Sequence, residues 1–386
     1  MDIEKSVRPE LAAMKGYSAV EPVDILEQQA GKRITKLDGN ENPYGCSPKV
    51  HQALADYPYY HIYPDPEQRI LRQALAELTG FSRERIVCGN GSDELIDLIL
   101  RLFLEAGDEV INCPPTFGMY PFSTEVCGGK VVNVLRDGNF AIDLAGIKQA
   151  LNKRTKVIFI ASPNNPTGDV IAEHEVVELL STGRIVVVDE AYFEFSNMTM
   201  AKLVLEHPNL MVLRTFSKWA GLAGLRVGYG IFATEIATYL MKIKPPYNIN
   251  VAAQAAALAS LADLDCLRAN IVKITAERQR LFTKLGELEW LKPYPSQANF
   301  ILCTLYSSSA SFTSGQCEAS GAKRPTNLDQ GELRQESPAK QLWRQLRKKG
   351  IFVRYYDSPG LRNCLRISVG KPEDTDALIN ALKEIC

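Results

Sequence analysis

Five short runs of apolar, mostly β-branched residues recur along the middle of the chain, with longer segments of mixed polarity between them. They occupy residues 109–112, 130–134, 156–160, 184–188 and 210–213. The runs do not alternate between apolar and polar residues, which is typical of strands buried on both faces of a sheet. Strands that alternate with helical segments indicate a largely parallel sheet covered by helices, so we predict an α/β fold.

The whole chain divides into three predicted regions, one of which contains this sheet. Residues 1–44 are predicted to form an N-terminal arm and the start of a small domain, and residues 45–255 the large domain. Residues 256–386 are expected to form a smaller α+β domain. Within it, residues from about 306 to 341 are rich in Ser, Gly, Gln and Glu, so we expect a flexible surface insertion. A helix is predicted to resume the fold at Gln341.

Length and charge narrow the class of protein. A chain of 386 residues has room for about two or three domains. Its formal net charge is −1, so no electrostatic argument favours binding to nucleic acid or to an anionic membrane.

The nine cysteines are scattered, without CxxC pairs or histidine partners. This pattern predicts reduced thiols in a cytoplasmic protein, with neither a disulfide framework nor a metal site. The first residues, Met1-Asp2-Ile3-Glu4-Lys5, are polar and acidic, so we expect no signal or transit peptide there. No apolar run is long enough to span a membrane.

The segment after the last of the five runs carries the strongest chemical signal. Lys218 follows a buried strand directly, where open α/β sheets bind their ligands. The residues near it in sequence resemble a phosphate-binding site: Thr215 and Ser217 supply hydroxyls, and Arg226 supplies a bidentate guanidinium donor. A lysine beside a phosphate-binding site suggests a Schiff base with pyridoxal phosphate. A surface lysine in a turn is the simpler alternative for this residue alone.

A second candidate phosphate contact lies earlier in the chain. Residues 85–88 are predicted to form a strand, and Gly91, Ser92 and Asp93 follow it at the start of a helix. Small residues at a helix N-terminus leave backbone N–H groups free to bind an anion. Many strand-to-helix turns have this composition, so the signal is weak by itself.

Two more motifs stand at predicted strand ends. Asp189 ends one strand, and burial of its carboxylate calls for a cationic partner such as a protonated pyridine nitrogen. Asn165 and Tyr192 follow neighbouring strands and could hydrogen-bond the phenolic oxygen of the same ring. A capping aspartate and an ordinary Asn-Pro turn are the alternatives for each motif taken singly. The motifs that contain Asn165, Asp189 and Lys218 all occur at predicted strand ends, which favours a shared site over three unrelated turns.

The motifs together resemble those of a known family. The sequences Ser162-Pro163-Asn164-Asn165-Pro166-Thr167-Gly168, Asp189-Glu190-Ala191-Tyr192 and Thr215-Phe216-Ser217-Lys218 are similar to those of the class I and II pyridoxal-phosphate aminotransferases of fold type I. The resemblance covers nearly the whole chain. It implies a large, mostly parallel seven-stranded sheet domain and a smaller α+β domain. More narrowly, residues 40–45, 63–66, 115–120 and 365–370 resemble the histidinol-phosphate aminotransferases.

The resemblance implies a role for each cofactor-binding residue. Lys218 binds pyridoxal 5′-phosphate and moves the substrate proton, Asp189 pairs with the ring nitrogen, and Tyr192 and Asn165 contact the phenolic oxygen. Phe117 stacks on the ring, where the family often has tyrosine. The phosphate is surrounded by Gly91, Ser92, Asp93, Thr215, Ser217 and Arg226. Tyr63 reaches the cofactor phosphate of a neighbouring subunit, which implies a homodimer with shared active sites.

The resemblance also implies the substrates. Arg366 matches the arginine that binds the α-carboxylate of glutamate, and Arg354 matches one that holds the phosphate of histidinol phosphate. Tyr17 matches a tyrosine that closes over this phosphate, and Asn40 belongs to the same substrate site. The expected reaction transfers an amino group between L-histidinol phosphate and 2-oxoglutarate, in histidine biosynthesis.

The sequence leaves two enzymatic alternatives open: an aromatic amino-acid aminotransferase and a phosphate-ester amino-acid decarboxylase of the same fold. A non-catalytic cofactor-binding regulator is disfavoured, because Lys218 is present and the N-terminal arm is short and not basic.

Overall fold

The computed structural model describes residues 3–31, 33–306 and 336–385 and divides into two compact units. The first unit comprises Met1–Ser18, Tyr44–Asn165 and Asp169–Ile271, and the second comprises Ala19–Pro43, Pro166–Gly168 and Val272–Cys386. Most of the predicted insertion at 306–341 lies outside the described residues.

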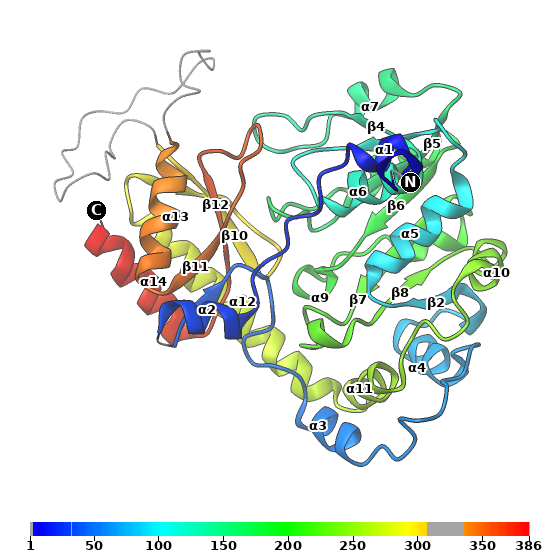
Figure 1. The fold of residues 1–386 in the computed structure, drawn as a ribbon, viewed down its shortest axis with the longest axis horizontal. Coiled ribbons are helices and arrows are strands. Elements are labelled where there is room, and N and C mark those ends of the chain that lie inside the picture. Colours follow the sequence, from blue (N-terminus) through cyan, green and yellow to red (C-terminus); the bar gives the residue numbers. More distant parts are fainter. Residues whose placement is uncertain (1–2, 32, 307–335, 386) are drawn as a thin grey trace. The chain divides into compact units, whose positions relative to one another are not determined.

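The first unit is built on a seven-stranded sheet, as predicted (Figure 1). Its strands, in spatial order, are β2 (Ile86–Gly89), β8 (Gly228–Ile231), β7 (Leu210–Thr215), β6 (Ile185–Asp189), β5 (Thr155–Ala161), β3 (Glu109–Asn112) and β4 (Lys130–Asn133). Strand β8 is antiparallel to both its neighbours, and the other pairs are parallel. All five apolar runs are strands of this sheet.

One of these strands differs from the prediction of burial on both faces. Strand β4 is the last strand of the sheet, and its four residues are exposed or half-buried. Strands β6 and β7, in contrast, lie in the middle of the sheet and are almost wholly buried. The β-branched composition of β4 therefore reflects its pairing with β3 rather than two covered faces.

Helices cover the sheet of the first unit. Its helices are α1 (Pro9–Ala12), α3 (Pro48–Ala55), α4 (Arg69–Thr79), α5 (Ser92–Phe103), α6 (Met119–Val126), α7 (Leu144–Ala150), α8 (Glu173–Leu180), α9 (Phe193–Ser196), α10 (Thr234–Ile243) and α11 (Val251–Leu261). Side chains of α5, α6 and α10 form one buried cluster with alternate residues of the strands, so these helices lie on the same face. Figure 1 shows α5, in cyan, next to this sheet.

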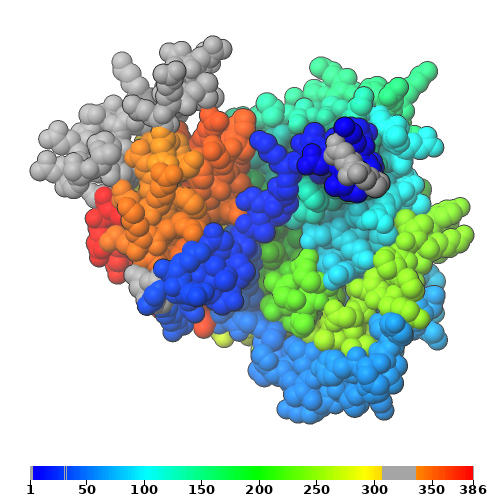
Figure 2. Space-filling view, viewed as in Figure 1, coloured from blue at the N-terminus to red at the C-terminus, as the bar shows by residue number. Residues whose placement is uncertain are grey.

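The start of the chain packs on the first unit. Figure 2 shows the first residues, in dark blue, lying against the cyan segment. A guanidinium N–H of Arg8 donates to the carbonyl oxygen of Val126 at 3.3 Å. This part of the predicted arm, up to Ser18, therefore belongs with the sheet rather than with the small domain.

The first unit also extends further along the chain than residue 255. Helix α12 (Leu264–Gly286) begins in it, and α11 packs against α3. The hydroxyl of Ser47 donates to the carboxylate of Asp263, and Lys49 Nζ donates to the carbonyl oxygen of Ala262 at 2.8 Å. These contacts hold residues 256–271 to the first unit, which the local sequence pattern does not reveal.

The second unit contains a five-stranded sheet. Its spatial order is β1 (Thr35–Leu37), β11 (Ile351–Tyr355), β12 (Cys364–Ser368), β10 (Phe300–Leu305) and β9 (Leu291–Pro293). Strand β1 is parallel to β11, and the other pairs are antiparallel. Besides most of α12, the unit contains α2 (Val23–Ala30), α13 (Pro338–Lys348) and α14 (Pro372–Ile385).

Helix α13 begins three residues before the predicted Gln341. The hydroxyl of Ser337 accepts a hydrogen bond from the backbone N–H of Lys340, and Pro338 occupies the first helical position. Ser followed by Pro is a helix-start signal, so the last residues of the predicted insertion are helical.

No helix of the described residues combines the length and the apolar composition that crossing a membrane requires. Within the same residues, no group of three or more His, Cys, Asp or Glu side chains is arranged to hold a metal ion.

Candidate active site

The site of the first unit starts at the end of β7. Thr215 is buried, and its hydroxyl oxygen accepts a hydrogen bond from the backbone N–H of Ser217 at 3.1 Å. Trp219 Nε1 donates to the carbonyl oxygen of Thr215 at 2.9 Å and so ties the other side of the turn. Lys218 lies between these two anchored residues and is half-buried. The turn therefore fixes the backbone of Lys218 at the carboxyl end of a central strand.

Arg226 brings the two predicted phosphate contacts together. Its Nη1 lies 3.4 Å from the hydroxyl oxygen of Ser217, and its carbonyl oxygen accepts a hydrogen bond from the backbone N–H of Gly91 at 3.0 Å. Arg226 has a left-handed backbone, with φ of 54°. Its Nη2 also contacts the carboxylate of Asp93 at 2.8 Å. The predicted phosphate residues from two separate parts of the chain thus meet at one place.

Glycine is required where these two segments touch. A Cβ atom on Gly91 would lie 2.4 Å from Arg226 Nη2, and one on Gly228 would lie 2.5 Å from the backbone nitrogen of Ser92. Gly91 is also the N-cap of α5, so N–H groups of the first helical turn are exposed to an anion there. Two hydroxyls, a guanidinium and a helix N-terminus form a donor set that fits a phosphate group.

Asp189 lies at the end of β6 and is 4% exposed. Its Oδ2 accepts a hydrogen bond from the hydroxyl of Tyr120 at 2.8 Å, and its Oδ1 accepts one from the backbone N–H of Ala191 at 3.1 Å. Burial raises the pKa of the Asp189 carboxyl to about 6, although both hydrogen bonds oppose the rise. A buried carboxyl of this kind is stabilised as an anion by a cationic partner, and a protonated pyridine nitrogen fits that requirement.

Tyr120 belongs to this group of residues, but the sequence analysis did not identify it as a candidate site residue. It is 0% exposed, and its contact with Asp189 joins residues 69 positions apart in the chain. The sequence signal for Tyr120 is its position three residues after Phe117, within the segment 115–120 that resembles the family. Such a spacing places two side chains near each other on a helix start, but it does not reveal a partner on another strand.

Phe117 connects the arm to this group of residues. Its ring lies edge-on to that of Tyr120, with centroids 5.6 Å apart, and edge-on to that of Tyr17 at 6.4 Å. Tyr17 also lies close to Gly118, since a Cβ atom there would be 3.1 Å from Tyr17 Cε2. The structure therefore places the predicted arm tyrosine beside the predicted ring-stacking residue.

The loop that carries Asn165 is held at both ends. The side chain of Asn164 accepts a hydrogen bond from Thr116 Oγ1 at 2.7 Å and donates to the carbonyl oxygen of Pro115 at 3.0 Å. On the other side, Arg136 Nη1 contacts the carboxylate of Asp169 at 2.7 Å. Asn165 itself is half-buried.

Tyr192 is the last of the predicted ring contacts in this unit. It is 6% exposed and lies three residues beyond Asp189, directly before α9. It therefore leaves the sheet at the same edge as the aspartate.

Three predicted substrate residues belong to the second unit. Arg366 on β12 is 5% exposed and donates to the carbonyl oxygen of Asp38, while Arg354 is its register partner on β11. Asn40 is buried, and its backbone N–H donates to Ser368 Oγ at 2.9 Å. The structure thus gathers Asn40 and both arginines around neighbouring strands of one sheet.

Tyr63 is 78% exposed and stacks on Tyr247, with ring centroids 4.5 Å apart. Among the described residues, its contacts include no other predicted site residue of this chain.

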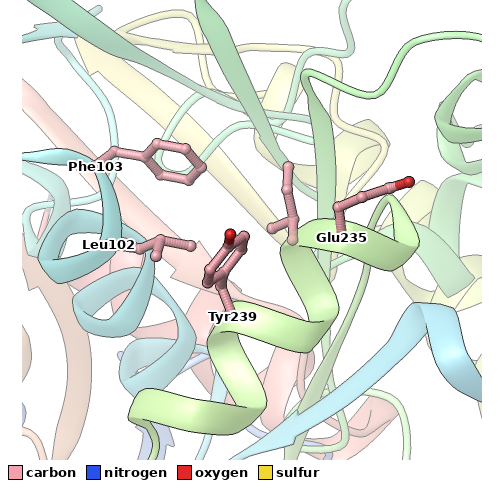
Figure 3. Close-up of a pocket in the computed structure, with 5 residues that line it drawn as sticks. Leu102, Phe103, Glu235 and Tyr239 are labelled. Carbon is pink, nitrogen blue, oxygen red and sulfur yellow. The ribbon is translucent and has the colours of Figure 1, made fainter.

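A small surface pocket lies elsewhere on the first unit (Figure 3). It has a volume of about 250 Å³ and is lined by Leu102, Phe103, Glu235, Ile236 and Tyr239. None of these residues belongs to the predicted site, and its largely apolar lining offers no chemistry for amino-group transfer.

Comparisons with known proteins agree on one family. The family model of aminotransferase class I and II matches residues 32–382. The histidinol-phosphate aminotransferase of Dehalococcoides mccartyi is 49% identical over 384 residues, which are 100% of this chain and 99% of the relative. The chloroplastic histidinol-phosphate aminotransferase of Nicotiana tabacum is 43% identical, covering 98% of this chain and 86% of its own.

A solved structure gives the same result. The histidinol-phosphate aminotransferase from Sinorhizobium meliloti in complex with pyridoxal-5′-phosphate matches with a TM-score of 0.82 and 28% identity. The match covers 98% of this chain and 97% of that structure. The resemblance inferred from the motifs is confirmed, and so is the fold.

Proposed function

The chain belongs to the class I and II aminotransferase family, and from this premise we propose that it transfers an amino group between L-histidinol phosphate and 2-oxoglutarate in histidine biosynthesis. The observation that carries the proposal is the 49% identity, over the full length of both chains, with a histidinol-phosphate aminotransferase. Each of the two chains is covered over nearly its whole length, so the proposal does not rest on a shared fragment.

Pyridoxal 5′-phosphate is the proposed cofactor. When bound, it supplies an electron sink for the electrons left when the substrate Cα loses its proton. Gly91, Ser92, Thr215, Ser217 and Arg226 would hold its phosphate, because they present hydroxyl, guanidinium and backbone N–H donors at one place. The backbone N–H of Asp93 would add to these, while its side chain pairs with Arg226.

Each remaining residue of the first unit has a proposed task. Lys218 binds the cofactor and afterwards takes and returns the proton of the substrate Cα as a general base and acid. Asp189 keeps a proton on the ring nitrogen by pairing with it. Tyr192 and Asn165 hydrogen-bond the phenolic oxygen, and Phe117 packs against the ring.

Two neighbouring arginines support an anionic substrate. Arg354 and Arg366 are directly opposed on antiparallel strands, and Arg366 is 5% exposed. Like charges in this arrangement destabilise a sheet unless an anion offsets them. Histidinol phosphate and glutamate are both anionic. We propose that Arg366 binds the α-carboxylate of glutamate, and that Arg354 and Tyr17 bind the phosphate of histidinol phosphate, with Asn40 in the same site.

A homodimer in the cytoplasm completes the proposal. Exposed apolar side chains gather in one segment that ends at the 78% exposed Tyr63, and they include Tyr59, Tyr60 and Ile62. A partner subunit would cover this segment, and Tyr63 would reach the partner's cofactor phosphate. The seven cysteines among the described residues are unbonded, which supports a reducing compartment.

The test is to follow the visible absorption of the purified protein while L-histidinol phosphate or L-phenylalanine is added in separate experiments. We expect histidinol phosphate to abolish the band of the lysine-bound cofactor at low concentration and phenylalanine to act only weakly. The reverse order would make the protein an aromatic amino-acid aminotransferase. Absence of a visible band after supply of pyridoxal phosphate would contradict the role of Lys218.

A further inference from the structure

The hydroxyl of Tyr120 is a hydrogen-bond donor to the buried carboxyl of Asp189. The two oxygens are 2.8 Å apart, and an ionised carboxylate can only accept, so the tyrosine donates. Burial, together with the nearby Asp189 charge, holds the pKa of Tyr120 well above its ordinary value. The hydroxyl therefore keeps its proton and remains a donor across the ordinary pH range.

The ring of Tyr120 is held from two sides. It stacks on Phe159, with centroids 4.7 Å apart and planes inclined by 6°, and it lies edge-on to Phe117 at 5.6 Å. Its backbone carbonyl accepts a hydrogen bond from Thr124 Oγ1 at 2.7 Å. A ring that is 0% exposed and packed in this way cannot swing its hydroxyl away from the aspartate.

The carboxyl of Asp189 depends on this contact for its orientation. Its Oδ1 is bound by the backbone N–H of Ala191, two residues away, and its Oδ2 is bound by Tyr120. Within the described part of the chain, Tyr120 is the side chain that hydrogen-bonds this carboxyl. One donor on each oxygen fixes the plane of the group, whereas the Ala191 contact alone would leave it free to rotate.

The ionisation of Asp189 depends on the same contact. Burial raises the pKa of its carboxyl to about 6, and the nearby Asp93 and Glu190 charges raise it too. The hydrogen bond from Tyr120 is the largest of the influences that lower the pKa of Asp189. Loss of this donor would favour the neutral carboxyl, which cannot form an ion pair.

We propose that Tyr120 is a positioning residue that keeps Asp189 ionised and oriented for a cationic ring nitrogen. The inference rests on the proposed function, because it requires a cofactor with such a nitrogen. It gives two tasks in one site to a short segment, since Phe117 immediately precedes the N-cap of α6 and packs on Tyr120 of the helix.

The experiment compares two ligands in wild type and Tyr120→Phe. The first ligand is pyridoxal phosphate, and the second is the analogue in which a C–H group replaces the ring nitrogen. Each full-length protein is freed of cofactor, and both dissociation constants are measured by titration of the visible absorption. We expect Tyr120→Phe to weaken pyridoxal phosphate by about tenfold relative to the analogue, as for a lost hydrogen bond to a charged group.

The affinity for pyridoxal phosphate divided by that for the analogue distinguishes a positioning role of Tyr120 from a packing role. A purely structural role for Tyr120 would weaken both ligands equally and leave the ratio unchanged. The matched control is Tyr229→Phe, which removes the hydroxyl of another buried tyrosine that partners Arg214 instead of Asp189. We expect this control to keep the wild-type ratio.

Each remaining outcome decides the question. A wild-type ratio in folded Tyr120→Phe overturns the role of Tyr120 alone. If this variant does not fold, the nearly isosteric Tyr120→3-fluorotyrosine replaces it, because its hydroxyl is a stronger donor. This variant must bind pyridoxal phosphate more tightly relative to the analogue than wild type does. An unchanged or lower relative affinity overturns the proposal. A wild-type protein that binds neither ligand overturns the proposed cofactor, and with it this inference.

Discussion

Glu194 is a buried acidic group outside the proposed mechanism. The residue keeps some exposure, but its Oε2 atom is buried and, among the described residues, has no hydrogen-bond partner. Burial raises the pKa of its carboxyl to about 8 from a usual 4.5, although the Arg214 charge opposes the rise. The folded protein therefore binds a proton here that the unfolded chain has already released.

The sign of the resulting pH dependence follows from this difference. Between pH 4.5 and about 8 the folded state holds more protons, so stability falls as the pH rises through that range. We expect Glu194→Gln to remove this loss, which is on the order of 2 kcal/mol, because each pKa unit corresponds to about 1.4 kcal/mol and partial exposure reduces the effect. Urea unfolding at pH 6 and pH 9 measures it. The exposed Glu206→Gln is the control, and equal pH profiles for both variants would contradict the assignment.

Gly91 gives a second prediction at the residue scale. A Cβ atom there would lie 2.4 Å from Arg226 Nη2, and its φ of 76° strains any residue with a side chain. We expect Gly91→Ala to lower the free energy of unfolding by about 1–2 kcal/mol and to weaken pyridoxal phosphate at least tenfold, because the guanidinium must move.

Gly224→Ala is the matched control for this change. Gly224 lies in the loop that carries Arg226, and nothing is within 4 Å of its added Cβ atom. Calorimetry and cofactor titration should show it to be close to wild type. A Gly91→Ala protein with wild-type cofactor affinity would show that Arg226 does not bind the phosphate.

At the scale of elements, a buried ion pair joins the two strands that end in Asp189 and Thr215. Arg214 on β7 contacts the carboxylate of Glu190, which follows β6, at 2.9 Å, and both side chains are buried. The guanidinium also donates to Thr199 Oγ1 at 2.7 Å and lies 3.8 Å from the centre of the Phe193 ring. These contacts fix the carboxyl end of β6, where Asp189 lies, and that of β7, which Lys218 follows.

Removal of one partner should therefore be much more damaging than removal of both. Arg214→Met leaves Glu190 charged and buried, so we expect the free energy of unfolding to fall by about 3–5 kcal/mol. The double variant Arg214→Met/Glu190→Gln should recover most of this loss. Urea denaturation checks both. Arg101→Met, which breaks an exposed pair with Asp97, should lose at most about 1 kcal/mol, and a similar loss for Arg214→Met would sink the prediction.

Six strands of the large sheet were predictable because each carries its own apolar run, whereas β8, with two glycines in four residues, was not predicted. The three-residue strands β1 and β9 have no such local signal, since each is a strand only by pairing with a neighbour. The same limit applies to the site. Lys218 and Arg226 stand in recognisable motifs, whereas the contact of Tyr120 with Asp189 depends on how the sheet brings two distant segments together.

At the scale of the whole molecule, the proposed site residues divide between the two units. The residues proposed to bind the cofactor belong to the first unit, together with Tyr17 of the substrate set. The other proposed substrate residues, Asn40, Arg354 and Arg366, belong to the second. Because of this division, substitutions in the second unit should change the affinity for substrate without changing the affinity for the cofactor. A substitution in the second unit should leave the visible spectrum and the cofactor dissociation constant unchanged.

Arg354→Gln tests this separation. If Arg354 binds the substrate phosphate, its loss removes a charge-assisted contact of about 1.5–3 kcal/mol, so we expect KM for histidinol phosphate to rise about 10- to 100-fold. KM for glutamate should change much less, because Arg366 is proposed to bind that carboxylate. Arg366→Gln should show the opposite preference, and steady-state kinetics with each substrate measures both. Equal effects of Arg354→Gln on the two substrates would instead assign this arginine to the structure of the β11–β12 pair, where the two guanidinium-bearing residues are in register.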